Sequence, residues 1–291
     1  MTLAQYYSME MHNYSLEITA REISGLDEAA SFIAPGTRIA IAFLASESMD
    51  DRVNAAARIR SHGFVPVPHV AARRLRSQDE LRRFLEDLSV RAAVDQLLVI
   101  AGDLPKPDGP YEDALHLIRR TNLAHHGIRH VEISGYPEGH PNISESVLRS
   151  AMQDKLQELE KRGLRASIVT QFGFDALPVL TWLRKLRTVG INAPVRVGAP
   201  GPANVRTLLR YAALCGVTAS ASVMQKYGLS LTKLLGHAGP DALVKDLQSG
   251  YEPAVHGQVS LHIYPFGGLT KAVNWVTAFQ QRQTLVSKDL R

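Results

Sequence analysis

The chain has 291 residues, of which 21% are charged and 45% hydrophobic, and a formal net charge of +5. These values are ordinary for a soluble globular protein that can bury a sizeable core. The single cysteine, Cys215, excludes an intrachain disulfide and an all-cysteine metal site. No apolar run reaches the ~18 residues of a transmembrane helix, and residues 1–13 lack the basic-then-apolar order of a signal peptide. We therefore expect a cytoplasmic protein with no membrane partner.

Eight apolar, β-rich runs recur along the chain and predict eight strands. Helical stretches with apolar residues at three- and four-residue spacing separate most of them; two examples are Glu80–Leu88 and Val205–Leu214. The predicted strands are mostly apolar rather than alternating, which is typical of parallel strands covered on both faces. In chain order they are Ser15–Thr19, Arg38–Phe43, Val65–Val70, Gln96–Gly102, His130–Tyr136, Ala166–Gln171, Pro194–Ala199 and Ser260–Phe266.

Eight strands alternating with helices in this length predict an α/β fold, a (β/α)8 TIM barrel forming one domain over residues 1–291. A doubly wound open sheet is the alternative. It would normally carry a glycine-rich phosphate loop after its first strand, and Ile18–Glu22 contains no glycine. Between Val217 and Gln258 the pattern is helical (Leu231–Leu235 and Pro240–Leu247) with no strand. We interpret this stretch as extra helices before the last strand.

Five arginines gather between positions 73 and 83, close to several acidic residues. Without a zinc spacing, an aromatic stacking motif or a basic tail, they favour a solvated, salt-bridged helix face over a nucleic-acid site. Histidines elsewhere show no pairing with acids that would suggest a metal site. Cys215 lies in an apolar helical pattern, which predicts a buried thiol. The arginines are Arg73, Arg74, Arg76, Arg82 and Arg83.

Polar residues occur at the predicted strand ends, where (β/α)8 barrels build their active sites. Glu17 stands inside an apolar strand, where a carboxyl is costly to bury without a partner or a function. A carboxyl of this kind suits a general acid, the alternative being a side chain that faces solvent. Taken alone, Asp103 could equally be a residue of a simple turn. His69 could equally be a packed structural residue. The full set is Glu17, His69, Asp103, Tyr136, His140, Gln171 and Tyr264.

Three motifs in order carry a resemblance to a known family. They are Gly-Asp-Leu-Pro at 102–105, Tyr-Pro-Glu-Gly-His-Pro at 136–141 and Thr-Gln-Phe-Gly-Phe-Asp at 170–175. From about Ser15 to Tyr264 the chain resembles the methylenetetrahydrofolate reductase family. The resemblance implies an FAD-dependent barrel that interconverts 5,10-methylenetetrahydrofolate and 5-methyltetrahydrofolate, with NADH or NADPH as electron donor. Because family members are often oligomeric, a homo-oligomer is a further expectation.

The resemblance also implies roles for individual residues. Glu17 matches the acid that helps to open the methylene-bridged ring, and Asp103 matches an aspartate beside the flavin and the pterin. Gln171 and Tyr211 match positions that contact the folate. Lys155, or Lys161 with Arg162, could hold the FAD diphosphate. The flavin-contacting positions are matched by His69, Ile100, Ala101, Gly102, Tyr111, Ser134, Tyr136, His140 and Tyr264.

The chain departs from the family pattern at several places. Ala101 replaces an arginine, Ala42 a threonine, and Gly267-Gly268 an Asn-Arg pair that would contact the folate tail. Two other classes of function stay open beside the reductase. One is a flavin-free barrel that transfers a folate-bound one-carbon group, and the other is a non-catalytic subunit that binds flavin or folate.

Overall fold

The computed structural model describes residues 10–215 and 237–289. Eight strands hydrogen-bond in the order β1-β10-β7-β6-β5-β4-β3-β2, and the parallel sheet closes into a barrel with surrounding helices. The predicted (β/α)8 fold is thus confirmed, and each predicted strand is present with ends shifted by a few residues. The barrel strands are β1 (Glu10–Ile18), β2 (Arg38–Ile41), β3 (Val65–Ala71), β4 (Gln96–Ile100), β5 (His130–Gly135), β6 (Arg165–Phe172), β7 (Val195–Pro200) and β10 (Val259–Tyr264).

Helices follow most of the strands, as the sequence pattern predicts. The α-helices are α2 (Ser24–Ala29), α3 (Met49–Ser61), α4 (Gln78–Ala92), α5 (Ala114–Arg120), α6 (Glu145–Lys161), α7 (Ala176–Thr188), α8 (Val205–Leu214), α11 (Asp241–Gly250), α12 (Pro253–His256) and α13 (Leu269–Asp289). Short 3-10 turns are η1 (Ala20–Glu22), η2 (Ala30–Phe32), η3 (Ala72–Arg74) and η4 (Leu123–His126). None of the described helices is long and apolar enough to cross a membrane.

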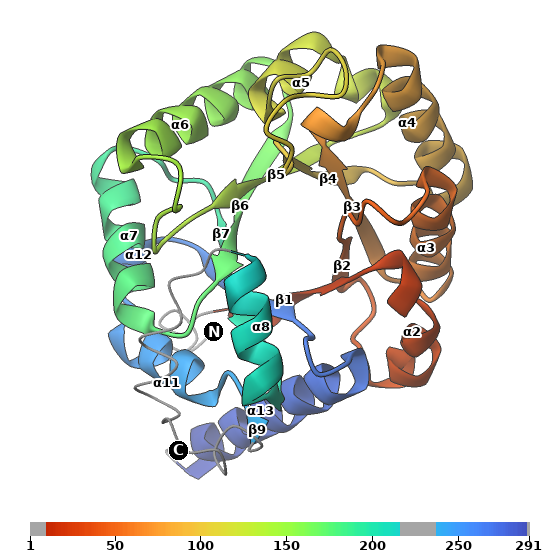
Figure 1. The fold of residues 1–291 in the computed structure, drawn as a ribbon. Coiled ribbons are helices and arrows are strands. Elements are labelled where there is room, and N and C mark those ends of the chain that lie inside the picture. The colour runs from red at the N-terminus through yellow and green to blue at the C-terminus, as the bar shows by residue number, and fades with distance from the viewer. Residues whose placement is uncertain (1–9, 216–236, 290–291) are drawn as a thin grey trace. The chain divides into compact units, whose positions relative to one another are not determined.

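The chain divides into two compact units. The first unit comprises Met1–Leu16, Ser24–Ala34 and Thr170–Arg291, and the second comprises Glu17–Ile23 and Pro35–Val169. In the second unit, β2, β3, β4 and β5 pair in parallel, with His69 opposite Leu98 and Gln96 opposite His130. Helices α3 and α4 lie side by side over this part of the sheet (Figure 1).

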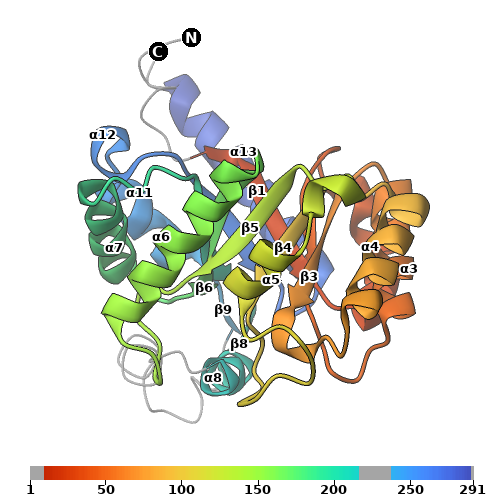
Figure 2. The ribbon, with the colours of Figure 1, turned by 90° about the horizontal axis from the view of Figure 1, so that it is seen from above.

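In the first unit, β10 pairs with β7 along its whole length, from Val259 opposite Val195 to Tyr264 opposite Pro200. Helices α11 and α12 pack on α7, and α13 packs on α2. Figure 2 shows α7, α11 and α12 grouped together from a second direction. The helical interpretation of Pro240–Leu247 is confirmed by α11.

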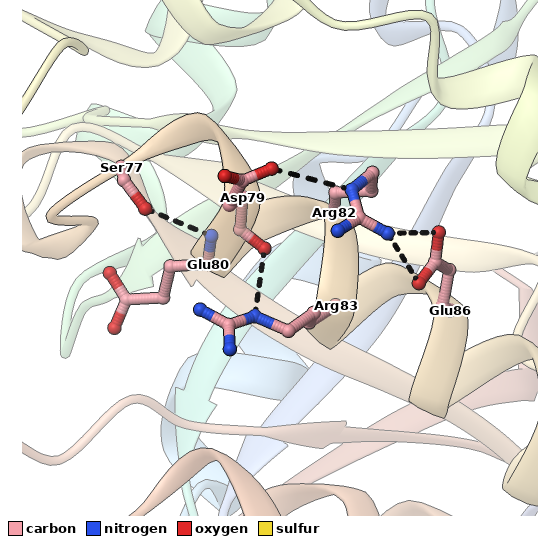
Figure 3. Close-up of polar contacts among 6 residues, drawn as sticks. All are labelled: Ser77, Asp79, Glu80, Arg82, Arg83 and Glu86. Atoms are coloured by element: carbon pink, nitrogen blue, oxygen red, sulfur yellow. Dashed lines mark hydrogen bonds and ion pairs between the residues drawn. The ribbon is translucent and has the colours of Figure 1, made fainter.

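Local sequence chemistry explains where α4 begins and which face it buries. The Ser77 hydroxyl accepts a hydrogen bond from the Glu80 N–H at 3.0 Å, which caps the first turn. On the opposite, solvated face, Arg82 pairs with Glu86 at 2.9 Å and with Asp79 at 3.5 Å (Figure 3). The expected salt-bridged face is therefore confirmed for this helix. It is wrong for Arg73 and Arg74, which lie in η3 ahead of the helix. The buried face comprises Leu81, Phe84, Leu85 and Leu88.

Two further expectations need correction. A short strand, β9 (His237–Ala238), lies in the stretch expected to hold none, and pairs antiparallel with β8 (Ala203–Asn204). Cys215 is exposed rather than buried, because it lies just beyond Leu214, the last residue of α8, and so outside the helix. The helix expected at Leu231–Leu235 lies outside the described residues.

Candidate active site

The second unit brings together the two residues at the ends of β1 and β3. Leu16 and Ile18 are buried on one face of β1, so the intervening Glu17 points to the other face. Its Oε2 lies 3.2 Å from Nε2 of His69, and the two side chains are only 16% and 9% exposed. The angles at this contact fall outside hydrogen-bond geometry, and Nε2 has no other hydrogen-bond partner among the described residues. A carboxyl and an imidazole thus face each other, and both are largely shielded from solvent.

A buried arginine, Arg52, contacts the backbone of His69 in this pair. Arg52 donates from Nη1 to the His69 carbonyl at 3.5 Å. Its guanidinium lies 4.7 Å from the ring centroid of Phe43 and 4.9 Å from that of Phe84. Burial lowers the pKa of the Arg52 guanidinium, an effect that the charge of Glu47 opposes. Our sequence reasoning missed Arg52, which lies among the buried, mostly apolar residues of α3.

Asp103 follows β4 and is held by an arginine from the preceding strand's end. Gly102 adopts a φ of +91°, which turns the chain back toward η3. Nε and Nη2 of Arg74 donate to Oδ1 and Oδ2 of Asp103 at 3.0 and 2.9 Å. These two hydrogen bonds fix the orientation of the Asp103 carboxylate, and its side chain is 76% exposed to solvent. Arg74 was also missed, because the arginine cluster was interpreted as one helix face.

The loop after β5 carries the Tyr-Pro-Glu-Gly-His-Pro motif. The rings of Tyr136 and His140 meet edge-to-face, with centroids 5.3 Å apart. A turn closed by the Gly139 N–H on the Tyr136 carbonyl at 3.0 Å brings them together. Ser134 is half-buried at the end of β5. Tyr111, by contrast, is only 2% exposed, so it offers little surface to a ligand.

Lys155 on α6 is a partly buried ammonium group. Burial lowers its pKa, and Asp113 is the charge that opposes this effect. Within the described part of the chain, Lys155 makes no hydrogen bond and no ion pair. Arg162 is occupied by Glu158 at 2.7 Å, and Lys161 is exposed. Of Lys155, Lys161 and Arg162, Lys155 is therefore the residue that is shielded from water and forms no ion pair within the described residues.

The first unit contains the other predicted contacts. The Phe172 N–H donates to Oε1 of Gln171 at 3.0 Å, which leaves the Gln171 amide NH2 to act as a donor. Tyr264 donates its hydroxyl to the Thr170 carbonyl at 3.0 Å. Tyr211 stacks on Phe266, with ring centroids 4.2 Å apart.

Phe266 also stacks on Tyr264, with centroids 5.7 Å apart, so it links two predicted site residues. It was missed by sequence reasoning, although an aromatic residue just beyond Tyr264 was a signal. Among the described residues, no group of three or more histidine, cysteine, aspartate or glutamate side chains could hold a metal ion.

The fold and these side chains define a class: a (β/α)8 barrel with a carboxyl–imidazole pair and an oriented carboxylate at its strand ends. Residues 39–263 match the family described as methylenetetrahydrofolate reductase, and the chain belongs to that family. Glu17 and Tyr264 lie outside the matched residues, so their roles do not follow from the match.

One curated relative agrees with this assignment, and structural neighbours share the fold. Methylenetetrahydrofolate reductase (NADH) 1 of Arabidopsis thaliana is 26% identical over 189 residues, covering 59% of this chain. The match spans only 31% of the plant protein. A Clostridium thermocellum protein that binds two copies of 5-methyl-5,6,7,8-tetrahydrofolic acid has a TM-score of 0.57 at 11% identity, covering 98% of this chain and all of its own. Burkholderia cenocepacia dihydropteroate synthase has a TM-score of 0.51 at 11% identity, covering 94% and 93%. At these identities the structural neighbours show a shared fold.

Proposed function

We propose that this protein is an FAD-dependent oxidoreductase that interconverts 5,10-methylenetetrahydrofolate and 5-methyltetrahydrofolate, with NADH or NADPH as electron donor. One observation carries the proposal: in a chain of the reductase family, Glu17 and His69 meet at 3.2 Å, shielded from water at the strand ends. A folate as substrate is also in keeping with the same barrel fold in the Clostridium protein, which binds a methylated tetrahydrofolate.

The residues present fit FAD. Lys155 is a shielded ammonium without an ion pair in the described chain, which suits the diphosphate. The half-buried backbone at Ala101 and Gly102 and the paired rings of Tyr136 and His140 offer polar and flat surfaces for the flavin. When bound, FAD supplies hydride transfer at its N5 atom. The protein supplies orientation, a proton and hydrogen bonds.

Glu17 is the proposed general acid. Ring opening of methylenetetrahydrofolate needs a proton on the folate amine, and a carboxyl shielded from bulk water can hold that proton until the substrate arrives. His69 borders the same carboxyl and limits the positions that it can adopt. Asp103 and Gln171 would bind the folate, since one offers carboxylate oxygens and the other an amide NH2. Tyr211 would contribute a flat apolar face.

The first test is the visible absorption spectrum of the purified protein, followed by separate addition of NADH and NADPH without oxygen. Flavin bands that bleach with a nicotinamide donor support the reductase and name the donor. Flavin that is reduced only by 5-methyltetrahydrofolate points to folate oxidation with another electron acceptor. A colourless protein that does not take up added FAD overturns the proposal and favours the flavin-free alternative.

The second test isolates the acid. Glu17→Gln should keep FAD and its reduction by the nicotinamide donor, while folate turnover falls at least ~100-fold, as expected on losing a general acid. Glu28→Gln, which changes an exposed glutamate on α2, is the matched control and should behave as wild type. Normal folate turnover in the Glu17 variant would remove this residue from the mechanism. Tight FAD binding in the wild type with no turnover under any donor would favour a non-catalytic binding subunit.

A further inference from the structure

Two adjacent arginines of η3 reach the loop after β4 in different ways. Arg73 donates from Nη1 to the Leu104 carbonyl at 3.0 Å and from Nε to the Glu112 carbonyl at 2.6 Å. Its own N–H donates to the Ala101 carbonyl at 2.9 Å, and its carbonyl accepts from the Asp108 N–H at 2.8 Å. Arg73 therefore fixes the backbone of this loop at four points.

Arg74 makes no such backbone contact from its side chain. Both of its hydrogen bonds go to the Asp103 carboxylate, one to each oxygen, in the planar two-point geometry that guanidinium and carboxylate groups share. The backbone that carries Asp103 is already held by Arg73. The Arg74 fork thus adds little to loop placement, and instead fixes the plane of the carboxylate and balances its charge.

Exposure separates this pair from an ordinary structural salt bridge. The Asp103 side chain is 76% exposed and the Arg74 side chain is 24% exposed. The carboxylate is therefore open to solvent, while the guanidinium that binds it is mostly buried. Surface ion pairs contribute little to stability even when they form. Each carboxylate oxygen keeps a second lone pair after accepting from Arg74, so the carboxylate can still accept from a ligand's N–H groups.

From this geometry we infer that Arg74 is a positioning residue, which orients the Asp103 carboxylate as a charge-balanced acceptor for the N–H groups of the folate pterin. This inference rests on the proposed function. It assigns the two arginines separate tasks: Arg73 holds the backbone of the loop, and Arg74 orients the Asp103 carboxylate.

The test measures the Kd of 5-methyltetrahydrofolate and the FAD content of the full-length protein in five variants. They are Arg74→Gln, Arg74→Lys, Asp103→Asn, the double variant Arg74→Gln/Asp103→Asn, and Arg76→Gln. Arg76 is an exposed arginine two residues away, so its variant controls for loss of one positive charge near the same turn. FAD content and far-UV circular dichroism show whether each variant has folded and loaded its cofactor.

We expect Arg74→Gln and Asp103→Asn each to raise the Kd about tenfold, the scale of a lost charged hydrogen bond. Arg74→Gln should leave the FAD content unchanged. The double variant should be no weaker than Asp103→Asn alone, because Arg74 acts through that carboxylate. Arg74→Lys should resemble Arg74→Gln, since an ammonium group cannot make the two-point contact.

Three results overturn the inference while the wild type still turns over folate: additive losses in the double variant, full rescue by lysine, or an equal loss in Arg76→Gln. A wild-type protein that binds neither FAD nor 5-methyltetrahydrofolate instead defeats the proposed function, and the role of Arg74 with it.

Discussion

Lys155 is the residue whose environment most directly predicts a bound anion. Its charge is partly withdrawn from water, which lowers its pKa, and no carboxylate pairs with it in the described structure. Such an arrangement costs stability in the free protein. The cost is offset when an anionic group such as a diphosphate binds, because the ammonium then regains an opposite charge.

Replacing Lys155 should therefore have opposite effects on FAD binding and on the stability of the FAD-free protein. We expect Lys155→Met to weaken FAD binding at least about tenfold, on the scale of a charged hydrogen bond, and to stabilise the FAD-free protein against urea at pH 7. Isothermal titration and urea unfolding measure the two effects. Lys161→Met, an exposed position on the same helix, should change neither. Weaker FAD binding in Lys161→Met with no change in Lys155→Met would move the diphosphate contact to Lys161.

The pH dependence follows from the direction of the Lys155 pKa shift. Burial lowers this pKa below its ordinary value of 10.5, so in the free protein the unfolded chain binds the proton more tightly. Lys155 therefore destabilises the fold at neutral pH, and this penalty fades as pH rises toward 10.5. The stability difference between Lys155→Met and the wild type, measured without FAD, should shrink over the same alkaline range. A difference that grows with pH would contradict the assignment.

The local sequence pattern singled out Glu17, because it interrupts an apolar strand. His69 was selected from its place near the end of a predicted strand and from the family resemblance. Arg74 could not be found in this way, since its partner Asp103 is 29 positions away and the contact depends on how two strand ends meet. Arg52 was missed for a related reason: its aromatic partners come from separate segments of the second unit.

At the scale of elements, strand β7 approaches β6 so closely that only glycine fits at position 198. A Cβ there would lie 2.7 Å from the Thr170 carbonyl oxygen and 2.8 Å from that of Gln171. The Gly198 N–H also donates a hydrogen bond to the Thr170 hydroxyl oxygen at 2.8 Å. The backbone that carries Gln171 is thus set by the absence of a side chain on the neighbouring strand.

Gly198→Ala should lower the free energy of unfolding by about 1–3 kcal/mol, the usual cost of overpacking, and should weaken 5-methyltetrahydrofolate binding by displacing Gln171. Urea unfolding and isothermal titration measure the two effects. Gly25→Ala is the control, because its Cβ would meet nothing within 4 Å and alanine favours the helix. Equal stability of Gly198→Ala and the wild type would show that β6 and β7 can separate without cost.

Element types were predictable where the hydrophobic pattern spans a whole strand or helix, as in α8, whose bounds match the predicted Val205–Leu214. Short elements were not. The two-residue pair of β8 and β9 depends on a contact between distant segments and has no periodicity of its own. The exposure of Cys215 likewise depends on where a helix stops, which apolar spacing does not fix.

For the whole molecule, two of the four boundaries between the compact units fall inside strands. They cut β1 between Leu16 and Glu17 and β6 between Val169 and Thr170. Domain boundaries normally fall in exposed linkers that few contacts cross. The single domain expected over residues 1–291 therefore stays our prediction.

A single domain predicts one cooperative unfolding transition. Trp182 and Trp275, the two tryptophans of the chain, both belong to the first unit, so tryptophan fluorescence reports on that unit alone. Far-UV circular dichroism reports on the helices of both units. Urea curves from the two probes should coincide. Two separated midpoints would instead identify the units as independently folding domains.

The contact between Arg74 and Asp103 also limits how this gene can recombine with its homologues. The turn after β3 and the loop after β4 are joined by an ion pair and by the Arg73 contacts, yet β4 and α4 separate them along the chain. A crossover within this interval would give a chimera one parent's arginines and the other parent's loop. Such chimeras would keep the barrel pattern and lose the matched pair, so the two segments are expected to be inherited together.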